Sequence, residues 1–274
     1  MEPIIKWVGG KRWLAPRITP LIRKHLKGNY YEPFMGSASV FLAVQPTGKS
    51  YLYDSVDALV AAFLVIKREP MGVWSYLRRL RKTPNTQQAY NQHRSYFNGK
   101  LEHGQFDSEF AAYFLYLNRT GYNGLWRQNA NGDYNVPFGD YSKVRLPSIS
   151  ELIAFSKCTQ NASIRGITSP DDTLEVIRRT EPGDVIFSDP PYLNTYQGYD
   201  GIFEAGYDYQ SDLAIALWKS ARRGVKVFAT NIDCKETRGW YGAFCKIHTF
   251  KRAQSIAGTT QGRKQWNQIL AVSQ

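Results

Sequence analysis

The order of the expected elements indicates an α/β protein built on a mostly parallel sheet with helices on its faces. Residues 30–34 read as a short strand that ends in a Gly/Ser turn, and residues 51–53 read as a second strand. Toward the other end, residues 185–187 and 225–229 read as strands, separated by a helical run at 213–221. Strands that alternate with helices at both ends of the chain need crossover connections, which make neighbouring strands parallel.

Local signals support the individual elements. Residues 38–42 continue the first turn as a helix, and Asp54 and Ser55 form a good helix N-cap pair after the second strand. The apolar side chains that repeat at helical spacing behind this cap are Val56, Leu59, Val60, Phe63 and Leu64. Residues 244–250 and 269–272 read as two further strands, which complete the sheet.

The middle of the chain interrupts this alternation. Helical apolar spacing recurs there, but no strand-helix-strand unit does. Near the end of this region Asn131-Gly132 lies between two strand-like runs, which predicts a β-hairpin with a type I′ turn, whose two central residues both need positive φ. We therefore expect a catalytic domain of residues 1–56 and 145–274, and an inserted, mostly helical unit of residues 57–144 that bears the hairpin.

The charge balance points to a polyanionic partner. Lys and Arg total 35 against 23 Asp and Glu, a net charge of +12, and such an imbalance costs self-repulsion. Nucleic acid is favoured over an anionic membrane surface, because no basic amphipathic helix with a polybasic anchor is evident. A basic protein without an anionic partner stays open as an alternative. The positive residues gather in 1–30, in 67–100 and in a third cluster of Lys251, Arg252, Arg263 and Lys264.

Several classes of protein are disfavoured. Cys158, Cys234 and Cys245 are odd in number and widely spaced, which suggests neither a disulfide framework nor a thiolate zinc site. No apolar run approaches the ~18 residues of a membrane span, and the N-terminus lacks the apolar core of a secretory signal. We therefore expect a cytoplasmic protein with no membrane attachment and no required metal.

The turn after the first strand, residues 32–39, is a candidate cofactor loop. It lacks the G-x-G-x-x-G pattern that lets a pyrophosphate approach the backbone, so a nicotinamide or flavin dinucleotide is disfavoured. Asp54 follows the next strand, where a carboxylate can accept hydrogen bonds from ribose hydroxyls. Together these features suggest an adenosine-containing cofactor without a diphosphate; the alternative is an ordinary turn with Asp54 as a helix cap.

The tetrapeptide Asp189-Pro190-Pro191-Tyr192 follows a strand directly, at the position where open α/β sheets bind ligands. Asp189 supplies a carboxylate acceptor, the two prolines remove two N–H donors, and Tyr192 offers a flat ring. Acceptors beside a stacking ring suit the exocyclic amine of a planar heterocycle, such as adenine N6 or cytosine N4 of an extruded base. The alternative is a rigid turn with a capping Asp and a packed Tyr.

Six blocks occur in the order of the Dam-type DNA adenine-N6 methyltransferases, a family that this chain resembles from residue 6 to about residue 272. The blocks are KWVGGK (6–11), EPFMGS (32–37), YD (53–54), NRTGYNG (118–124), NVPFG (135–139) and DPPY (189–192). The cofactor loop precedes DPPY, which matches the family's alpha arrangement. The resemblance implies a Rossmann-like fold that uses S-adenosylmethionine to methylate adenine N6 at specific sites in double-stranded DNA.

The resemblance also implies roles at the cofactor and at the reacting amine. The residues it places at the cofactor site are Trp7, Lys11, Glu32, Phe34, Asp54 and Asp189. Asp189 and the Pro190 carbonyl would accept from the N6 amine, and Tyr192 would stack on the flipped base. Because the sulfonium makes its methyl electrophilic, no metal is needed. A phosphate contact for Lys11 and simple core packing for Trp7 are the alternatives.

Further positions match those with which the family reads the palindrome GATC. They are Lys6 and Tyr141 for the first base pair, Leu125 and Pro137 for the third, Arg127 for the last, and Tyr122 with Asn123 in the space left by the flipped adenine. Arg bidentate to guanine is the commonest specific major-groove contact, and apolar groups suit a thymine methyl. Without the resemblance, a phosphate contact or salt bridge would suit Arg127, and core packing would suit Tyr122.

The chain departs from close relatives at Trp126, Asp140 and Asn267-Gln268, where small, basic and acidic residues respectively are usual. Three other functions stay open: a catalytically idle nucleic-acid-binding protein, a dinucleotide-dependent oxidoreductase, and a methyltransferase that acts on RNA. Restriction-modification, a phage, or replication and repair are equally compatible settings. A two-stranded hairpin favours the B-form major groove over A-form RNA, whose own major groove is too narrow to read.

Overall fold

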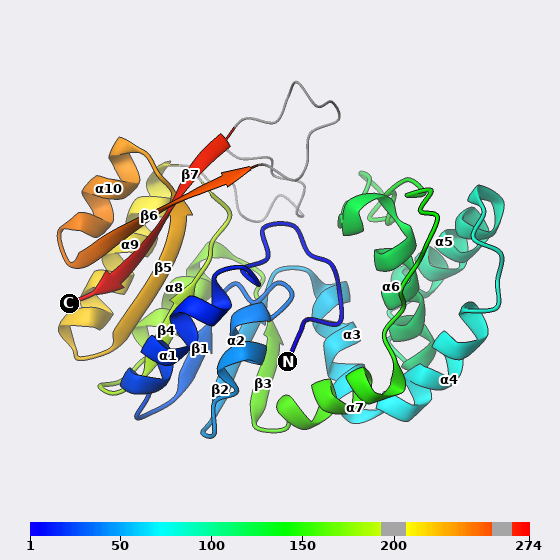
Figure 1. The fold of residues 1–274 in the computed structure, drawn as a ribbon, viewed down its shortest axis with the longest axis horizontal. Helices are drawn as coiled ribbons and strands as arrows, with labels where there is room; N and C mark the ends of the chain where they lie inside the picture. The colour runs from blue at the N-terminus through cyan, green and yellow to red at the C-terminus, as the bar shows by residue number, and fades with distance from the viewer. Residues whose placement is uncertain (193–206, 254–264) are drawn as a thin grey trace.

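The computed structural model describes residues 1–192, 207–253 and 265–274, and a seven-stranded sheet forms its centre (Figure 1). The strands are β1 (Tyr30–Glu32), β2 (Ser50–Asp54), β3 (Ala162–Gly166), β4 (Val185–Ser188), β5 (Lys226–Ile232), β6 (Cys245–Ala253) and β7 (Gln265–Ser273). Their order is β3-β2-β1-β4-β5-β7-β6. β1 to β5 pair with one another in parallel, and β7 is antiparallel to both β5 and β6. The predicted mostly parallel α/β sheet is confirmed.

Helices cover both faces of this sheet. The helices of the described residues are α1 (Ala15–His25), α2 (Ser39–Val44), α3 (Asp57–Arg68), α4 (Pro70–Leu80), α5 (Gln87–Glu102), α6 (Ser108–Thr120), α7 (Ile149–Cys158), α8 (Pro170–Arg178), α9 (Tyr207–Arg222) and α10 (Lys235–Gly242), with a 3-10 turn η1 at Tyr122–Gly124; of these, α4, α5 and α6 lie beside the sheet. Side chains of successive strand residues enter different cores, as a period of two requires. Tyr30 and Val185 join the core under α1 to α3, whereas Tyr31 and Ile186 join the core under α8 to α10.

The region between β2 and β3 is helical, as the sequence predicts. In Figure 1, α4, α5 and α6 lie at the side of the molecule away from α9 and α10. α3 packs against β2 and β3 and also against α6, so one apolar core runs from the sheet into this region. No helix among the described residues is long and apolar enough to cross a membrane.

The predicted turn at Asn131-Gly132 differs from the structure. Gly132 has a positive φ of +84°, but Asn131 does not, so the turn is not type I′. A backbone bond from Gly132 N–H to the Asn129 carbonyl (3.0 Å) closes a wider turn, followed by the left-handed glycine. The Asn129 side chain determines this choice, because its Oδ1 accepts from the N–H groups of Asn131 (3.0 Å) and Asp133 (2.9 Å). The flanking segments still pair antiparallel at Gln128 and Tyr134.

Candidate active site and nucleic-acid interface

The site lies where the direction of winding of the sheet reverses. β1 and β4 are neighbours, but the chain leaves β1 toward β2 and leaves β4 toward β5, on opposite sides. The loops that follow two such strands separate and leave a crevice at the carboxyl ends, which is where open α/β sheets bind ligands. Residues 33–38 follow β1 and residues 189–192 follow β4. The two motifs found in the sequence therefore meet at one crevice.

Both carboxylate oxygens of Asp189 accept a hydrogen bond, one from a charged donor and the other from a neutral donor. Lys11 Nζ lies 2.7 Å from Oδ2, and the Thr230 hydroxyl, from β5, donates to Oδ1 at 2.6 Å. The Lys11 side chain is only 3% exposed and also donates to the Gly9 carbonyl at 2.5 Å. Its ammonium lies 5.0 Å from the centre of the Tyr192 ring. The carboxylate is thus held as an oriented anion beside an aromatic face.

Thr230 is a contact that the sequence analysis missed. It lies near the end of β5, is 2% exposed, and reaches Asp189 because β4 and β5 are adjacent and parallel. Its signal in the sequence was its place in the strand 226–232, which ends at the same edge of the sheet as β4. A polar residue in a run otherwise rich in apolar side chains was the visible clue.

The cofactor loop is tied to the end of β2 by Asp54. Its Oδ2 accepts from Gly36 N–H at 2.8 Å, and its Oδ1 accepts from Val56 N–H at 3.0 Å. Gly36 has a φ of +45°, and a Cβ there would lie 2.8 Å from Cδ1 of Trp7. The indole therefore packs directly over the glycine backbone. The fold thus brings together Trp7 and Asp54, two of the residues predicted for the cofactor site, around Gly36.

Glu32 lies beneath this loop and is 1% exposed. Its Oε1 accepts from the Tyr30 hydroxyl at 2.6 Å and from Phe41 N–H at 2.7 Å. Burial raises the pKa of Glu32 to about 8, against the two hydrogen bonds, which lower it. The bond from Phe41 joins α2 to β1, and the bond from Tyr30 lies within β1. Phe34 is half-buried and packs on the core under α8 to α10.

We expect the Glu32→Gln variant to lose less stability than the parent as pH rises. With a native pKa near 8 and an unfolded pKa of about 4.3, the native state holds the extra proton between these values, so the unfolding free energy of the parent falls across this window. The amide of the variant stays neutral and keeps an acceptor oxygen. Urea unfolding at several pH values from 5 to 8 measures the difference. Equal slopes of the unfolding free energy against pH for parent and variant would contradict this prediction. The control variant Glu181→Gln changes an exposed residue and should leave the slope of the parent unchanged.

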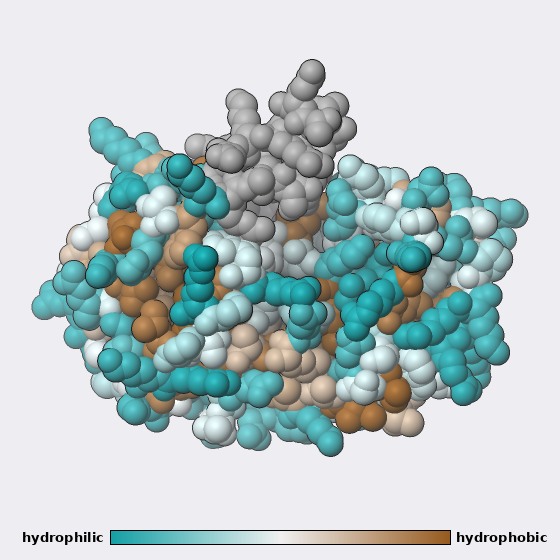
Figure 2. Space-filling view, in the orientation of Figure 1, coloured by the Kyte–Doolittle hydropathy of each residue, from teal (hydrophilic) through white to brown (hydrophobic). Residues whose placement is uncertain are grey.

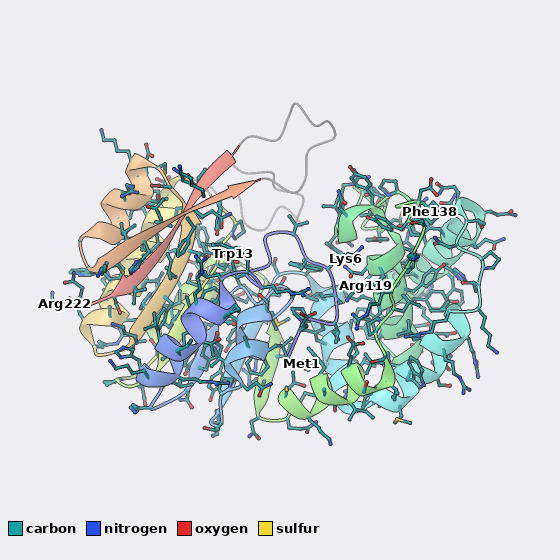
Figure 3. The ribbon with its side chains drawn as sticks, viewed as in Figure 1. Met1, Lys6, Trp13, Arg119, Phe138 and Arg222 are labelled. Carbon is teal, nitrogen blue, oxygen red and sulfur yellow. The ribbon has the colours of Figure 1, made fainter. Side chains whose placement is uncertain are left out.

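The N-terminal segment connects this crevice to the helical region. Asn118 clamps the backbone of Lys6: its Oδ1 accepts from Lys6 N–H at 2.8 Å, and its Nδ2 donates to the Lys6 carbonyl at 2.7 Å. Arg119 donates to the Ile4 carbonyl at 2.7 Å, and Figure 3 shows Lys6 and Arg119 side by side. The Lys6 ammonium lies 4.3 Å from the Tyr141 ring centre. Burial, with a smaller effect of Arg119, lowers the pKa of Lys6.

The turn after α6 presents an exposed ring. Tyr122 is 38% exposed. Its backbone is fixed, because the Tyr122 N–H donates to the Pro137 carbonyl at 2.9 Å. Asn123 has a φ of +54°, and its N–H donates to the Tyr141 hydroxyl at 2.6 Å. Tyr141 thus contacts both Lys6 and the turn, and the fold brings together three of the residues that the resemblance assigns to DNA.

Arg127 is exposed on the antiparallel arm, residues 125–137. Its Nε donates to Asn135 Oδ1 at 2.6 Å and its Nη2 to the Asn135 carbonyl at 3.0 Å. These bonds hold the guanidinium against the opposite segment. Pro137 is also exposed and Leu125 is half-buried.

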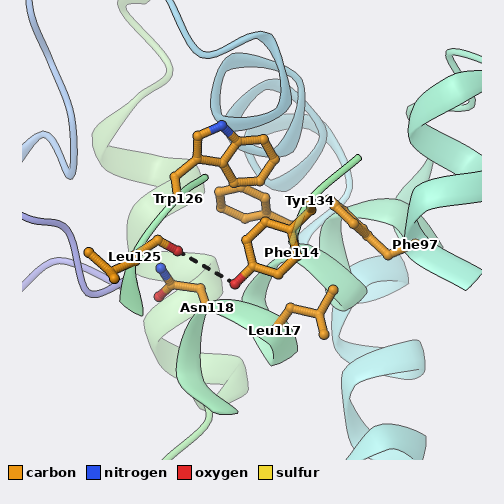
Figure 4. Close-up of a pocket in the computed structure, with 7 residues that line it drawn as sticks. All are labelled: Phe97, Phe114, Leu117, Asn118, Leu125, Trp126 and Tyr134. Atoms are coloured by element: carbon orange, nitrogen blue, oxygen red, sulfur yellow. Dashed lines mark hydrogen bonds between the residues drawn. The ribbon is translucent and has the colours of Figure 1, made fainter. Parts of the chain in front are cut away.

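Trp126 points away from the exposed side of this arm. It is 5% exposed and lines a small pocket with Phe97, Phe114, Leu117, Asn118, Leu125 and Tyr134 (Figure 4). The space among these side chains does not admit a water-sized guest. The pocket is therefore packed core that anchors the arm on α5 and α6. This explains how the bulky indole is accommodated in the arm.

Hydrophilic side chains cover much of the face shown in Figure 2, but not every basic residue is free to bind an anion. Lys67 donates to the Ala162 carbonyl at 2.7 Å, Arg81 donates to the carbonyls of Leu146 and Pro147, and Lys100 pairs with Asp107. The 67–100 cluster is in part structural. The Arg252 side chain, Arg263 and Lys264 lie outside the described residues. The described residues hold no group of His, Cys, Asp and Glu suited to a metal.

Residues 7–256 match the family described as D12 class N6 adenine-specific DNA methyltransferase. Together with the sheet and the DPPY crevice, this match defines the class: the chain belongs to the D12 class, and it is an adenine-specific DNA methyltransferase. The retron Ec67 DNA adenine methylase of Escherichia coli is 34% identical over 100% of this chain and 92% of its own length. The DNA adenine methylase of Escherichia coli K12 is 32% identical over 98% and 94%.

Solved structures that match the chain have lower sequence identity to it. The rRNA methyltransferase aviRa from Streptomyces viridochromogenes is 12% identical with a TM-score of 0.41, over 96% of this chain and 84% of that one. TrmN from Thermus thermophilus is 10% identical with a TM-score of 0.38, over 97% of this chain and 50% of that one.

Proposed function

We propose that the protein transfers a methyl group from S-adenosylmethionine to N6 of an adenine flipped out of double-stranded DNA, within GATC. The observation that carries the proposal is the Asp189 carboxylate, fixed on both oxygens at the carboxyl end of β4 beside the loop that follows β1. Residues 1–56 and 145–274 would form the catalytic domain, and residues 57–144 would recognise the target.

The residues at the ends of β1 and β2 fit S-adenosylmethionine. The Gly36 backbone lies under the Trp7 indole, and Asp54 lies at the tip of β2, where a carboxylate can accept from ribose hydroxyls. A Cβ at Gly9, whose φ is +77°, would meet no described atom within 4 Å. Lys11, Asp189, Glu32 and Phe34 would complete the cofactor site. When bound, the cofactor supplies a methyl group made electrophilic by its sulfonium.

Asp189 would orient and activate the adenine amine. Each carboxylate oxygen has two lone pairs, so Oδ2 can accept from the N6 amine while it keeps Lys11. N6 is a weak nucleophile because its lone pair is delocalised into the ring. Bonds from N6 to Asp189 and to the Pro190 carbonyl draw the amine toward tetrahedral geometry and stabilise the positive charge that develops on it.

Tyr192 would hold the flipped base. Stacking on an aromatic ring contributes about 1–3 kcal/mol, close to the few kcal/mol that unstacking costs. The exposed ring of Tyr122, with Asn123 beside it, would occupy the gap in the duplex.

The arm and the N-terminal segment would read the site. Lys6 and Tyr141, which contact each other, would read the first base pair. Leu125 and Pro137 would contact the thymine methyl of the third pair. Arg127, oriented by Asn135, would bond the guanine of the last.

The decisive experiment combines the protein with labelled S-adenosylmethionine and a plasmid, followed by mapping of the methylated adenines. We expect label in DNA only, on the adenine of GATC. Label on another sequence would remove the assignment of GATC, and label in RNA of matched sequence but not in DNA would remove the DNA target. An exchange of the cofactor for NADH should yield no reaction and no binding.

A further inference from the structure

Two buried amides contact the DPPY loop from behind. Gln210 on α9 and Asn231 on β5 have no exposed surface. Gln210 Nε2 donates to the Pro191 carbonyl at 2.7 Å, and Asn231 Nδ2 donates to Gln210 Oε1 at 2.8 Å. Asn231 Oδ1 in turn accepts from Ile232 N–H at 2.8 Å. A chain of three hydrogen bonds therefore runs from the backbone of β5 to the loop.

The direction of this chain is fixed by its ends. A backbone N–H can only donate, so the oxygen of Asn231 faces Ile232 and its nitrogen faces Gln210. The oxygen of Gln210 is then engaged, and its nitrogen faces Pro191, whose carbonyl can only accept. Neither amide can turn over without placing two acceptors or two donors in contact.

The loop needs such an external support. Pro190 and Pro191 have no N–H, so two successive residues of DPPY cannot donate to the rest of the protein. Within these two residues, only the carbonyl oxygens are left to bond the rest of the protein. Asp189 is held by Lys11 and Thr230, and the Pro191 carbonyl is held by Gln210.

We propose that Gln210 and Asn231 form a one-way amide relay that positions the Pro191–Tyr192 peptide, and with it the Tyr192 ring and the Pro190 carbonyl, for methyl transfer. Both are positioning residues, since they act through the loop. The inference rests on the proposed role of DPPY. Because transfer depends on alignment of the reacting atoms, loss of the relay should lower the transfer rate far more than ground-state binding.

The test compares Gln210→Leu and Gln210→Met, which lack the donor at similar size, with Asn231→Asp, which forces Gln210 to present its oxygen to Pro191. We expect single-turnover methylation to slow about 10- to 100-fold in all three, with the KM for DNA and the affinity for S-adenosylmethionine changed less than about threefold. The double variant Gln210→Met/Asn231→Leu should be no slower than Gln210→Met alone, because the bond to Pro191 is already lost in Gln210→Met.

Ser220→Ala is the matched control, since Ser220 is also a buried polar residue of α9, but its hydroxyl bonds Ile177 and Thr180 instead of the loop. It should lose stability and keep the transfer rate. Rates within twofold of the parent in the Gln210 variants, or additive effects in the double variant, would overturn the relay. Asp189→Ala measured in parallel separates the two hypotheses: an active Asp189→Ala refutes the catalytic assignment, whereas an inactive one beside fully active Gln210 variants refutes only the relay.

Discussion

Replacement of Asp189 by Ala is expected to abolish methylation, and Asp189→Asn should reduce the single-turnover rate by about 10²- to 10³-fold. Asn retains one acceptor oxygen and the size of the side chain, but it lacks the charge that stabilises the developing positive charge on N6. A filter assay with labelled cofactor and a GATC duplex measures both variants. Normal activity of either variant would contradict the catalytic role.

The control for this experiment concerns Lys11. Its ammonium is buried, and Asp189→Ala leaves it without its carboxylate partner, which is costly in a buried site. Some loss of stability is therefore expected in Asp189→Ala and less in Asp189→Asn. Thermal unfolding and cofactor binding separate misfolding from lost chemistry: Asp189→Asn should unfold near the parent's temperature and still bind the cofactor, while it remains slow.

Arg127→Ala is expected to relax discrimination at the last base pair of GATC by about 1–3 kcal/mol. The reason is that an exposed guanidinium, held by two bonds to Asn135, already has its orientation fixed before it meets a guanine edge. Competition between GATC duplexes and duplexes changed at the last pair measures the ratio of kcat/KM. The parent should discriminate strongly and the variant weakly.

Two comparisons make this result specific. Suppose instead that methylation of all duplexes slows equally, and that the slope of the log binding constant against log salt concentration becomes shallower by about one. Arg127 then contacts a phosphate and not a base. Asn135→Ala, which removes one of the two supports of the guanidinium, should reduce discrimination partially and at the same base pair. Arg178→Ala, an exposed arginine on α8, is the matched charge control and should leave discrimination unchanged.

The sequence predicted the central strands of the sheet and missed the edge strand β3. The strands at 30–34, 51–53, 185–187 and 225–229 correspond to β1, β2, β4 and β5, since each is a short apolar or aromatic run bounded by turn signals. β3 was missed because only its first three residues are buried or half-buried, so the alternation is short. α8 was missed although Ser169-Pro170 and Asp172 form a capping box with proline in the first turn, a signal that could have located it.

At the site, residue types in a short motif fixed the chemistry that is possible, because acceptors and a flat ring in DPPY depend on covalent structure alone. The strand order β1-β4-β5 determined which residues, distant in the sequence, complete the site. Thr230, Asn231 and Gln210 meet the loop only because β5 and α9 pack beside β4, and nothing in their local sequence specifies those neighbours. Likewise, the Asn131-Gly132 pair predicted a type I′ turn, but the hydrogen bonds of the Asn129 side chain stabilise a different turn.

The sequence by itself determined the α/β class, the crevice-forming loops and the resemblance to a methyltransferase family, because periodicity and motif order are properties of the chain. The tertiary structure decided which of the basic residues are exposed, that Trp126 is core, and that the Asp189 carboxylate is bonded on both oxygens. Such partners are chosen by long-range packing, in which residues 178 positions apart, Lys11 and Asp189, come within 2.7 Å.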